Sequence, residues 1–371
     1  MSEWKEYKLG EIANIQTGPF GSQLHQSDYV DVGIPSIMPV NIGDRMNIST
    51  EKIVYITEED ATRLSRYRVQ EGDIVYSRRG DVEKCAYIGK AEIGWLCGTG
   101  CLRIRIDSSK ADSKFIAYYL STEDMKSWIS NNAVGTTMPN LNSSILQQVP
   151  LSMPSLDEQK RIASILSSLD EKIDLLNREN ATLEAMAETL YGQWFVKEAK
   201  DEWEERKLGD FFDVKTGKKD ANYSVENGAF PFFTCSKQTL LAPSYSFEGS
   251  AILLAGNGDF NVKRYVGKFE AYQRTYVLIP YNVKYFNFLF IVMKHYLDEI
   301  TGGHRGSVIN FITKGMITDF PVTLPMEDID DKLKHFDVIF EKVDSNSAQI
   351  QTLIQARDGL LPKLLSNEIT I

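Results

Sequence analysis

The chain has 371 residues, of which 43% are hydrophobic and 25% charged, and its net charge is −10. This length is sufficient for two domains with their own cores, and no apolar run reaches the 18 residues of a membrane-spanning helix. A net negative charge, taken alone, argues against a nucleic-acid partner. Nine of the ten excess charges, however, lie in segments 151–202 and 326–371, so the two larger segments are nearly neutral.

The four cysteines are too few for a disulfide framework, so we expect the protein in a reducing cytoplasm. Cys97 and Cys101 have the spacing of half a zinc site. No second Cys or His pair at a suitable distance follows them, so we expect no metal.

Short β-like runs separated by glycine occur along the chain, together with two short helices. Strands are predicted at 73–77, 102–106 and 276–279, and helices at 113–129 and 286–299. Strands and helices in this mixture, without a regular βαβ repeat, predict α+β domains.

A long helix is predicted over 157–191, which contains neither proline nor glycine, and a second one lies in the C-terminal segment. Ser155 or Asp157 is expected to cap the first of them. Apolar residues in both recur at the 3.5-residue spacing of a coiled coil, although two amphipathic helices in a domain core would give a similar pattern. Asn180 and Asn346 interrupt the stripe, and buried asparagines of this kind fix register. The predicted stripe consists of Ile162, Leu166, Leu169, Ile173, Leu176, Asn180, Leu183 and Leu190 in the first helix, and Phe336, Ile339, Val343, Asn346, Ile350, Leu353 and Leu360 in the second.

Several short motifs occur twice in the same order, which indicates an internal repeat. They include Trp4–Glu11 with Trp203–Asp210, Gly80-Asp81 with Gly258-Asp259, Tyr87–Lys90 with Tyr265–Lys268, and Glu171–Asp174 with Glu341–Asp344. Each copy is a globular half followed by a helical tail. We therefore expect an α+β fold with a pseudo-two-fold internal repeat, in which two domains are joined by two long antiparallel coiled-coil helices. The expected divisions are 1–153, 154–200, 201–325 and 326–371.

The sequence contains none of the common catalytic motifs. There is no glycine-rich cofactor loop with an Asn-Pro-Pro-Tyr type motif, no P-loop, no HExxH and no Gly-x-Ser-x-Gly. Asp73 or Asp81 with Glu83 and Lys84 could serve a nuclease, but such close charges are usually solvated. Two alternatives therefore stay open: a standalone methyltransferase or nuclease, and a coiled-coil adaptor that binds protein or glycan.

Three segments carry a resemblance to a known family: Gly72–Gly80, Gly135–Leu141 and Pro150–Ile162, together with the doubled Trp-x-x-x-Lys-Leu-Gly opening. The sequence resembles the specificity (S) subunits of type I restriction–modification enzymes over essentially its whole length. The resemblance implies two target-recognition domains, each reading one half of a bipartite, asymmetric DNA target, and helices that set the gap. It further implies two methylation (M) and two restriction (R) subunits as partners. S-adenosylmethionine, ATP and Mg would then lie on those subunits, with no cofactor and no catalytic centre in this chain.

Loop residues with paired donors and acceptors are the candidates for base readout, and Lys, Arg and hydroxyl groups are those for phosphate contact. Any single one is equally compatible with a solvated loop residue, and Arg79 also with a buried ion pair, so the loops count more as sets. In the first domain the candidates are Ser22, Gln23, His25, Gln26, Asn41, Arg45, Arg78, Arg79, Lys84, Thr136, Thr137, Asn140 and Asn142. In the second they are Lys218, Lys219, Asn222, Tyr223, Ser236, Lys237, Gln238, Asn257, Lys263, Arg264, His304, Arg305, Ser307 and Asn310.

Overall fold

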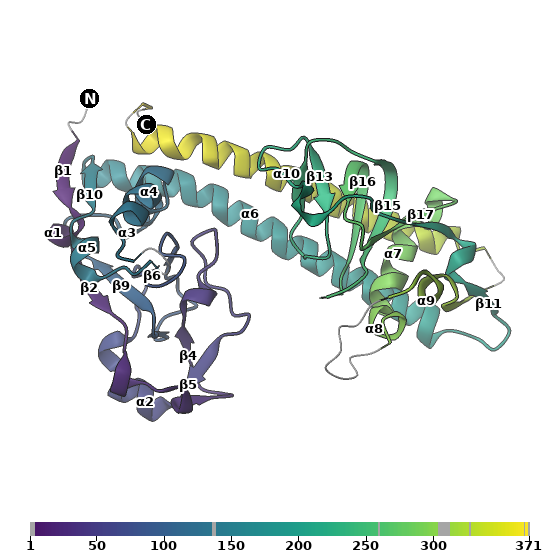
Figure 1. Cartoon of the computed structure of the whole chain (residues 1–371), viewed down its shortest axis with the longest axis horizontal. Coiled ribbons are helices and arrows are strands. Elements are labelled where there is room, and N and C mark those ends of the chain that lie inside the picture. Colours follow the sequence, from purple (N-terminus) through teal and green to yellow (C-terminus); the bar gives the residue numbers. More distant parts are fainter. Residues whose placement is uncertain are drawn as a thin grey trace. The chain divides into compact units, whose positions relative to one another are not determined.

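The computed structural model describes residues 4–135, 139–258, 260–302, 312–325, 328–366 and 368–369. The chain forms two compact units, Met1–Ile173 with Gln351–Ile371 and Asp174–Ile350. Their boundary falls inside two 36-residue helices, α6 (Leu156–Tyr191) and α10 (Asp330–Leu365), so each unit holds one globular domain and part of both helices (Figure 1). Among the described residues, no helix combines the length and the apolar composition needed to cross a membrane.

The first globular domain contains a strand pair and two four-stranded sheets. The pair is β1 (Lys5–Lys8) with β10 (Pro150–Met153). One sheet has the order β2 (Ala13–Thr17), β9 (Cys101–Ile106), β6 (Ile74–Ser77) and β7 (Cys85–Tyr87). The other has the order β3 (Tyr29–Val30), β5 (Val54–Ile56), β4 (Ile34–Ile37) and β8 (Leu96–Cys97). The α-helices are α1 (Leu9–Ile12), α2 (Glu58–Arg63), α3 (Ser113–Leu120), α4 (Glu123–Asn132) and α5 (Ser143–Gln147).

The second globular domain has the same plan with one larger sheet. Its strand pair is β11 (Glu204–Lys207) with β18 (Pro321–Leu324). The six-stranded sheet has the order β12 (Phe212–Thr216), β17 (Thr275–Pro280), β15 (Phe247–Ala255), β16 (Val262–Ala271), β13 (Phe230–Phe233) and β14 (Leu240–Ala242). The helices are α7 (Phe286–His295), α8 (Leu297–Ile300) and α9 (Lys314–Thr318). A π-helical turn, Gly192–Lys197, follows α6.

The repeat expected from the sequence is present in the hydrogen-bonded framework. Lys8 pairs with Pro150 at the end of β1, and Lys207 pairs with Pro321 at the end of β11. The next amide of each copy donates to a matching carbonyl, Leu9 to Val149 and Leu208 to Phe320, both at 3.0 Å. The two domains are thus two copies of one framework.

The Leu-Gly pair of the doubled opening has a packing reason. A Cβ atom on Gly10 would lie 2.9 Å from Cβ of Gln147, and one on Gly209 would lie 3.0 Å from the carbonyl oxygen of Thr318. In both copies the turn after the first strand passes directly against a short helix, α5 or α9. Only glycine allows this approach without a shift of the neighbouring chain.

In the first unit, α6 and α10 run antiparallel and share the core of the globular domain. Ile162 and Leu166 are buried in one cluster with Leu364 and Leu365. Nη1 of Arg357 donates to Asp170 at 2.8 Å, one antiparallel step further along the pair. Ser155 caps α6, because its Oγ accepts from the Glu158 amide at 3.4 Å.

In the second unit the same antiparallel pairing continues around a polar contact. Nδ2 of Asn346, which is fully buried, donates to Oδ1 of Asn180 at 2.9 Å. These are the two asparagines that interrupt the predicted stripe. A buried amide pair of this kind holds the two helices in one register.

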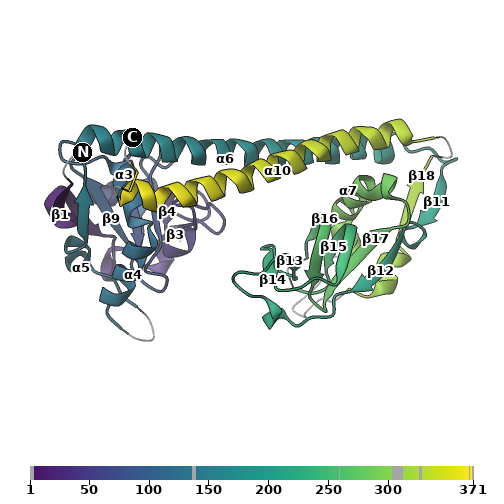
Figure 2. The same ribbon diagram turned by 90° about the horizontal axis from the view of Figure 1, so that it is seen from above.

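Burial along the helices agrees with most of the predicted stripe. Eight of its fifteen positions are buried. The half-buried positions are Leu169, Asn180, Leu183, Leu190, Ile339, Leu353 and Leu360. Ile339 packs against the core cluster of the second domain as a half-buried residue, and its neighbour Phe340 is fully buried. The Phe340 ring packs 5.4 Å from that of Phe290 on α7, so this part of α10 packs on the globular domain as well as on α6 (Figure 2).

Two predicted helices are each divided in the structure. Residues 113–129 form α3 and most of α4, and 286–299 form α7 and most of α8. The first break falls at Ser121 and Thr122, whose hydroxyls donate to the carbonyls of Tyr118 and Tyr119. Such local bonds compete with helix continuation. The three predicted strands lie in β6, β9 and β17.

Candidate nucleic-acid interface

The loop that follows β6 is the centre of the candidate surface in the first domain. The Arg78 amide donates to the Gly100 carbonyl, the Leu141 amide donates to the Arg78 carbonyl, both at 2.8 Å, and Arg79 forms a bridge with Asn140. The structure therefore brings the predicted residues Arg78 and Arg79 together with Asn140, and we call this meeting of three chain segments a loop junction. Thr136 and Thr137, from the same predicted run, lie outside the described residues.

The side chains of this loop differ in their exposure. The Arg78 guanidinium lies 5.9 Å over the ring of Phe20, which is 57% exposed, and Arg79 is exposed. Nε of Arg78 and Oδ1 of Asn140 are buried without a hydrogen-bond partner among the described residues. Asn142 instead caps α5, because its Oδ1 accepts from the Ile145 amide at 2.9 Å. The exposed guanidinium of Arg79 is a donor of the kind that base edges and phosphates accept from.

The predicted loop 21–26 lies beside Phe20 in the chain. Ser22, His25 and Gln26 are exposed. Gln23 is half-buried and accepts a hydrogen bond from the hydroxyl of Tyr67 at 2.8 Å, so its side chain is engaged within the domain. The loop therefore offers three free surface residues rather than four.

Asn41 is a structural residue, contrary to the prediction. It is fully buried, its Oδ1 accepts from the Met38 amide, and its Nδ2 donates to the carbonyls of Ser49 and Glu51. The sequence could not reveal these partners, because an asparagine in a polar loop reads equally as a ligand for a base. Its amide is fully used in holding the loop together.

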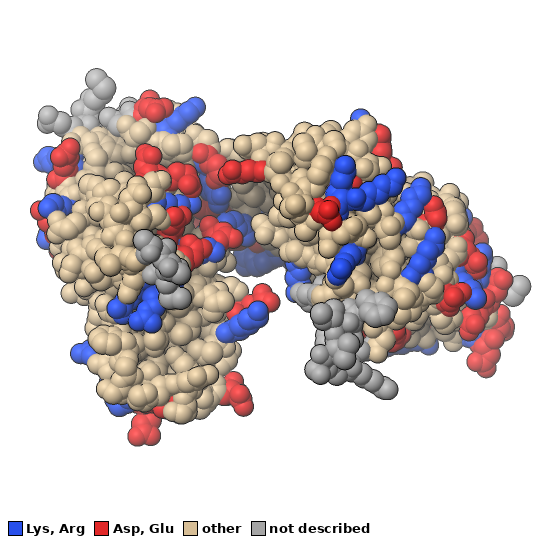
Figure 3. All heavy atoms as spheres, viewed as in Figure 1, with Lys and Arg blue, Asp and Glu red and all other residues tan. Residues whose placement is uncertain are grey.

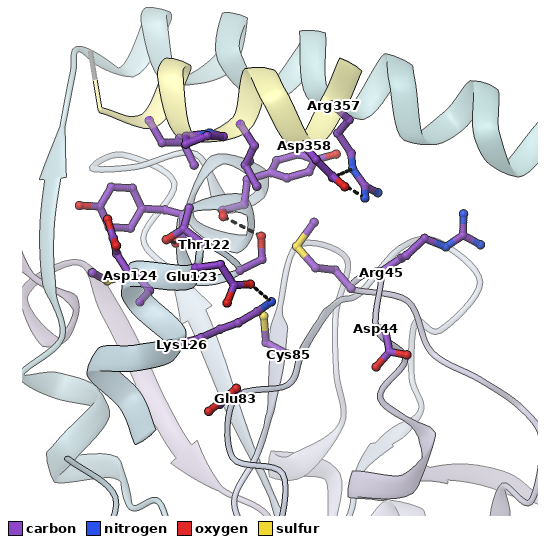
Figure 4. A pocket seen from close by; sticks show the side chains of 18 of the residues that line it. Asp44, Arg45, Glu83, Cys85, Thr122, Glu123, Asp124, Lys126, Arg357 and Asp358 are labelled. Atoms are coloured by element: carbon purple, nitrogen blue, oxygen red, sulfur yellow. Dashed lines mark hydrogen bonds and ion pairs between the residues drawn. The ribbon is translucent and has the colours of Figure 1, made fainter. Parts of the chain in front are cut away.

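Arg45 and Lys84 line a hollow of about 760 Å³ in the first unit (Figure 4). Acidic lining residues outnumber basic ones by eight to four, which disfavours a phosphate ligand here. Lys84 forms ion pairs with Asp44 at 2.7 Å and Asp81 at 3.3 Å, and the hydrogen bond to Asp44 is the main reason that its pKa is raised. These two predicted residues thus face an acidic hollow shared with α4 and α10.

The second domain builds the same loop junction after β15. The Gly256 amide donates to the Arg274 carbonyl at 2.8 Å, and the Ile312 amide donates to the Gly256 carbonyl at 3.1 Å. These bonds correspond to those of Arg78 with Gly100 and Leu141. Asn257 consequently takes the place that Arg79 has in the first domain.

Other predicted residues gather near this second junction. Lys219 forms a bridge with Tyr272, and its Nζ lies 4.3 Å over the ring of Tyr223. Nζ of Lys263 donates to the Ser236 carbonyl, and burial lowers the pKa of Lys263. Lys218, Asn222, Lys237 and Gln238 are exposed on the same domain.

Arg274 is a candidate that the sequence analysis missed. It is exposed, and its carbonyl accepts from the Gly256 amide and from Sγ of Cys235 at 3.4 Å, so it stands at the junction itself. Its position in the repeat could have indicated this role. Arg274 precedes the predicted strand 276–279 just as Gly100 precedes the predicted strand 102–106 in the first copy.

Arg264 was predicted to bind DNA and instead has a structural role. Its guanidinium makes two hydrogen bonds to the Asp344 carboxylate, at 2.6 and 2.9 Å. It lies between the rings of Phe286 and Phe340, and its side chain is 11% exposed. The residue ties β16 to α10 and is not available to a ligand. A buried ion pair was the structural alternative for Arg79 in the first domain. In the structure it is Arg264 of the second domain that forms such a pair.

Four predicted residues of the second domain, His304, Arg305, Ser307 and Asn310, lie outside the described residues. Among the described ones, Lys and Arg side chains gather over the β13 to β17 part of the second unit (Figure 3). The exposed Lys268 of strand β16 is one of these side chains, whereas Arg264 of the same strand is neutralised by Asp344. Although the chain is acidic overall, it therefore has a local basic face in a segment whose net charge is close to zero.

No cluster of three or more His, Cys, Asp or Glu side chains that could hold a metal occurs in the part of the chain that the structure describes. Cys85, Cys97 and Cys101 are buried free thiols. Burial raises the pKa of Cys85 and of Cys97 to about 12, so both thiols are protonated at neutral pH.

The fold and these junctions define a class: a duplicated α+β domain, each copy with its own exposed loop cluster, joined through a shared pair of long helices. Residues 1–185 and 200–355 match the family described as the type I restriction modification DNA specificity domain, and the chain belongs to this family.

Relatives with this description support the assignment. The chain is 25% identical over 415 residues to the type I restriction enzyme MjaIX specificity subunit of Methanocaldococcus jannaschii, covering 100% of this chain and 94% of that one. It is 41% identical over 164 residues to the EcoDI specificity subunit of Escherichia coli, a match that spans 44% of this chain and only 35% of that protein. The crystal structure of a type I restriction–modification S subunit from M. genitalium has the same fold, with a TM-score of 0.59 and 19% identity over 98% of this chain and 96% of that one.

Proposed function

We propose that this chain is the DNA-binding specificity subunit of a type I restriction–modification enzyme and that it recognises a bipartite, asymmetric target. Residues 1–153 and 201–325 are the two recognition domains, and 154–200 and 326–371 are the helical spacers that set the gap between half-sites. The chain works in the cytoplasm.

The duplicated loop junction is the observation that carries this proposal. Two equivalent loops are held by the same backbone hydrogen bonds but present different side chains, Arg79 in one and Asn257 in the other. Arginine pairs with guanine and asparagine with adenine in the major groove. One backbone framework that carries an arginine in one copy and an asparagine in the other supports recognition of two different half-sites by one chain.

The remaining parts of the enzyme belong to partner subunits under this proposal. Two M subunits bring S-adenosylmethionine and transfer the methyl group, and two R subunits bring ATP and Mg²⁺ for restriction. This chain contributes binding and assembly and no catalytic group. Native mass measurement of the assembled enzyme would give the number of each subunit.

Selection of duplexes from a random pool by the purified full chain tests the binding function. The expected result is a motif in two parts separated by a fixed gap, with an affinity that falls steeply and linearly on a log–log plot against salt. A protein or glycan adaptor would select no motif and would show no such salt dependence, and either of these results would reject the proposal.

A further inference from the structure

A second hollow in the first unit is lined by four arginines. Its volume is about 560 Å³, and the charged residues that line it are Arg66, Arg68, Arg103 and Arg105. None of these was among the predicted DNA contacts, and the loop after β6 does not line the hollow. It is therefore a feature apart from the loop junction already described.

The hollow forms where a segment of the chain crosses one face of strand β9. Arg103 and Arg105 are two residues apart in β9, so they point to the same face of the sheet. The segment that follows α2 crosses this face, and its carbonyls at Arg66 and Arg68 accept hydrogen bonds from Nη1 of Arg103. Strand β9 and the crossing segment thus place their guanidinium groups around one space.

The positive charge of the hollow is only partly neutralised. Asp73, which is buried, makes two hydrogen bonds of 2.7 Å to Arg105, and Glu58 reaches Arg68 at 3.5 Å. Arg103 is 6% exposed, has no carboxylate hydrogen-bonded to it among the described residues, and its buried Nε has no hydrogen-bond partner there. Burial, and then the neighbouring charge of Arg105, lowers the pKa of Arg103. A buried, unpaired guanidinium is costly unless an anion compensates it.

We propose that this arginine hollow binds a phosphate group, and that in the assembled complex a phosphate of the DNA backbone supplies it. Planar guanidinium groups match the geometry of phosphate oxygens and bind them in pairs. The assignment to DNA rests on the function proposed above, whereas the phosphate chemistry does not. Such a contact adds affinity and leaves sequence preference unchanged.

The test uses the full chain, inorganic phosphate as the first probe and duplex DNA as the second. Arg66→Gln removes an exposed lining arginine, and Arg103→Lys keeps the charge but removes the fork. Arg63→Gln is the matched control, because Arg63 is an exposed arginine of the adjacent α2 that pairs with Asp60 and does not line the hollow. Thermal shift at constant ionic strength gives the phosphate affinity, and anisotropy over a salt series gives the DNA affinity.

We expect phosphate affinity to fall about tenfold in Arg66→Gln and in Arg103→Lys, and to stay unchanged in Arg63→Gln. If the ligand is the DNA backbone, the log–log salt slope for DNA also falls by about one in Arg66→Gln, equally for all sequences. If the slope is unchanged while phosphate binding is lost, the hollow takes a free phosphate compound. Equal phosphate binding by all four proteins, or none by the wild type, would overturn the proposal. Phosphate binding by a wild-type chain that binds no duplex would leave the hollow intact and reject the proposed function.

Discussion

The two recognition domains share their framework and differ in what the framework presents. In the first, the loop after β6 carries Arg78 and Arg79, and in the second, the loop after β15 carries Gly256 and Asn257 at the same places. Conversely, strand β16 of the second domain carries Arg264, which is paired with Asp344, whereas β7 of the first domain, Cys85–Tyr87, contains no arginine. Backbone hydrogen bonds therefore define the repeat, whereas the side chains that the two frameworks carry have taken different roles.

The largest effect on stability is expected at Arg264, which joins β16 of the second domain to α10. Arg264→Ala should lower the free energy of unfolding by about 2–3 kcal/mol, because it removes two charge-assisted hydrogen bonds and two aromatic contacts. Lys268→Ala, an exposed lysine on the same strand, should change it by less than about 0.5 kcal/mol. Chemical denaturation measures both. Unchanged stability with weakened DNA binding in Arg264→Ala would return this arginine to the list of DNA contacts.

The shared framework can be broken in either copy by the same substitution. Gly10→Ala and Gly209→Ala should each lower stability by about 1–2 kcal/mol, because the added Cβ has no space against α5 or α9. Gly192→Ala is the control, since nothing lies within 4 Å of its added Cβ, and it should stabilise by about 0.5 kcal/mol. If only one copy responded, the framework would not be equivalent in the two domains.

The difference between the two loops can be sharpened by half-site measurements. Arg79→Ala should cost about 1 kcal/mol of binding free energy on one half of the target, and Asn257→Ala a similar amount on the other half. Competition with duplexes altered in one half at a time separates the two. Equal weakening on every duplex would instead place both residues on the DNA backbone.

The smallest effect on affinity, but a change in specificity, is expected from the helices. Inserting one heptad into both α6 and α10 lengthens each by about 10 Å, which corresponds to about three base pairs. The selected target should keep both half-sites and gain that many base pairs between them. A target gap that stays constant would reject the role of the helices as a spacer.

The helices and the repeat could be predicted from the sequence because they depend on local patterns. The absence of Pro and Gly with a 3.5-residue spacing predicted 157–191, and α6 spans Leu156–Tyr191. The burial of Phe340 in addition to Ile339 was not predictable, because it depends on α7 packing from the side. The break after α3 was missed because it depends on two hydroxyls that bond to the preceding turn.

The candidate surface was predicted less well, because a polar residue in a loop has the same composition whether it binds a ligand or holds the loop. Asn41 has partners within ten residues, and Arg264 has one 80 residues away, and neither set is visible in the sequence. Arg78, Arg79 and Asn140 were predicted and lie together, whereas Arg274 was missed. Spatial neighbours from distant segments decide these roles.

The two recognition domains of this chain are proposed to read two different half-sites. Methylome sequencing of the host with and without this gene, and with Asn257→Ala in its place, tests it most directly. We expect a two-part methylated motif that requires the gene, and in the variant a change confined to one half. A contiguous motif, or a methylome that is the same with and without the gene, would contradict the account.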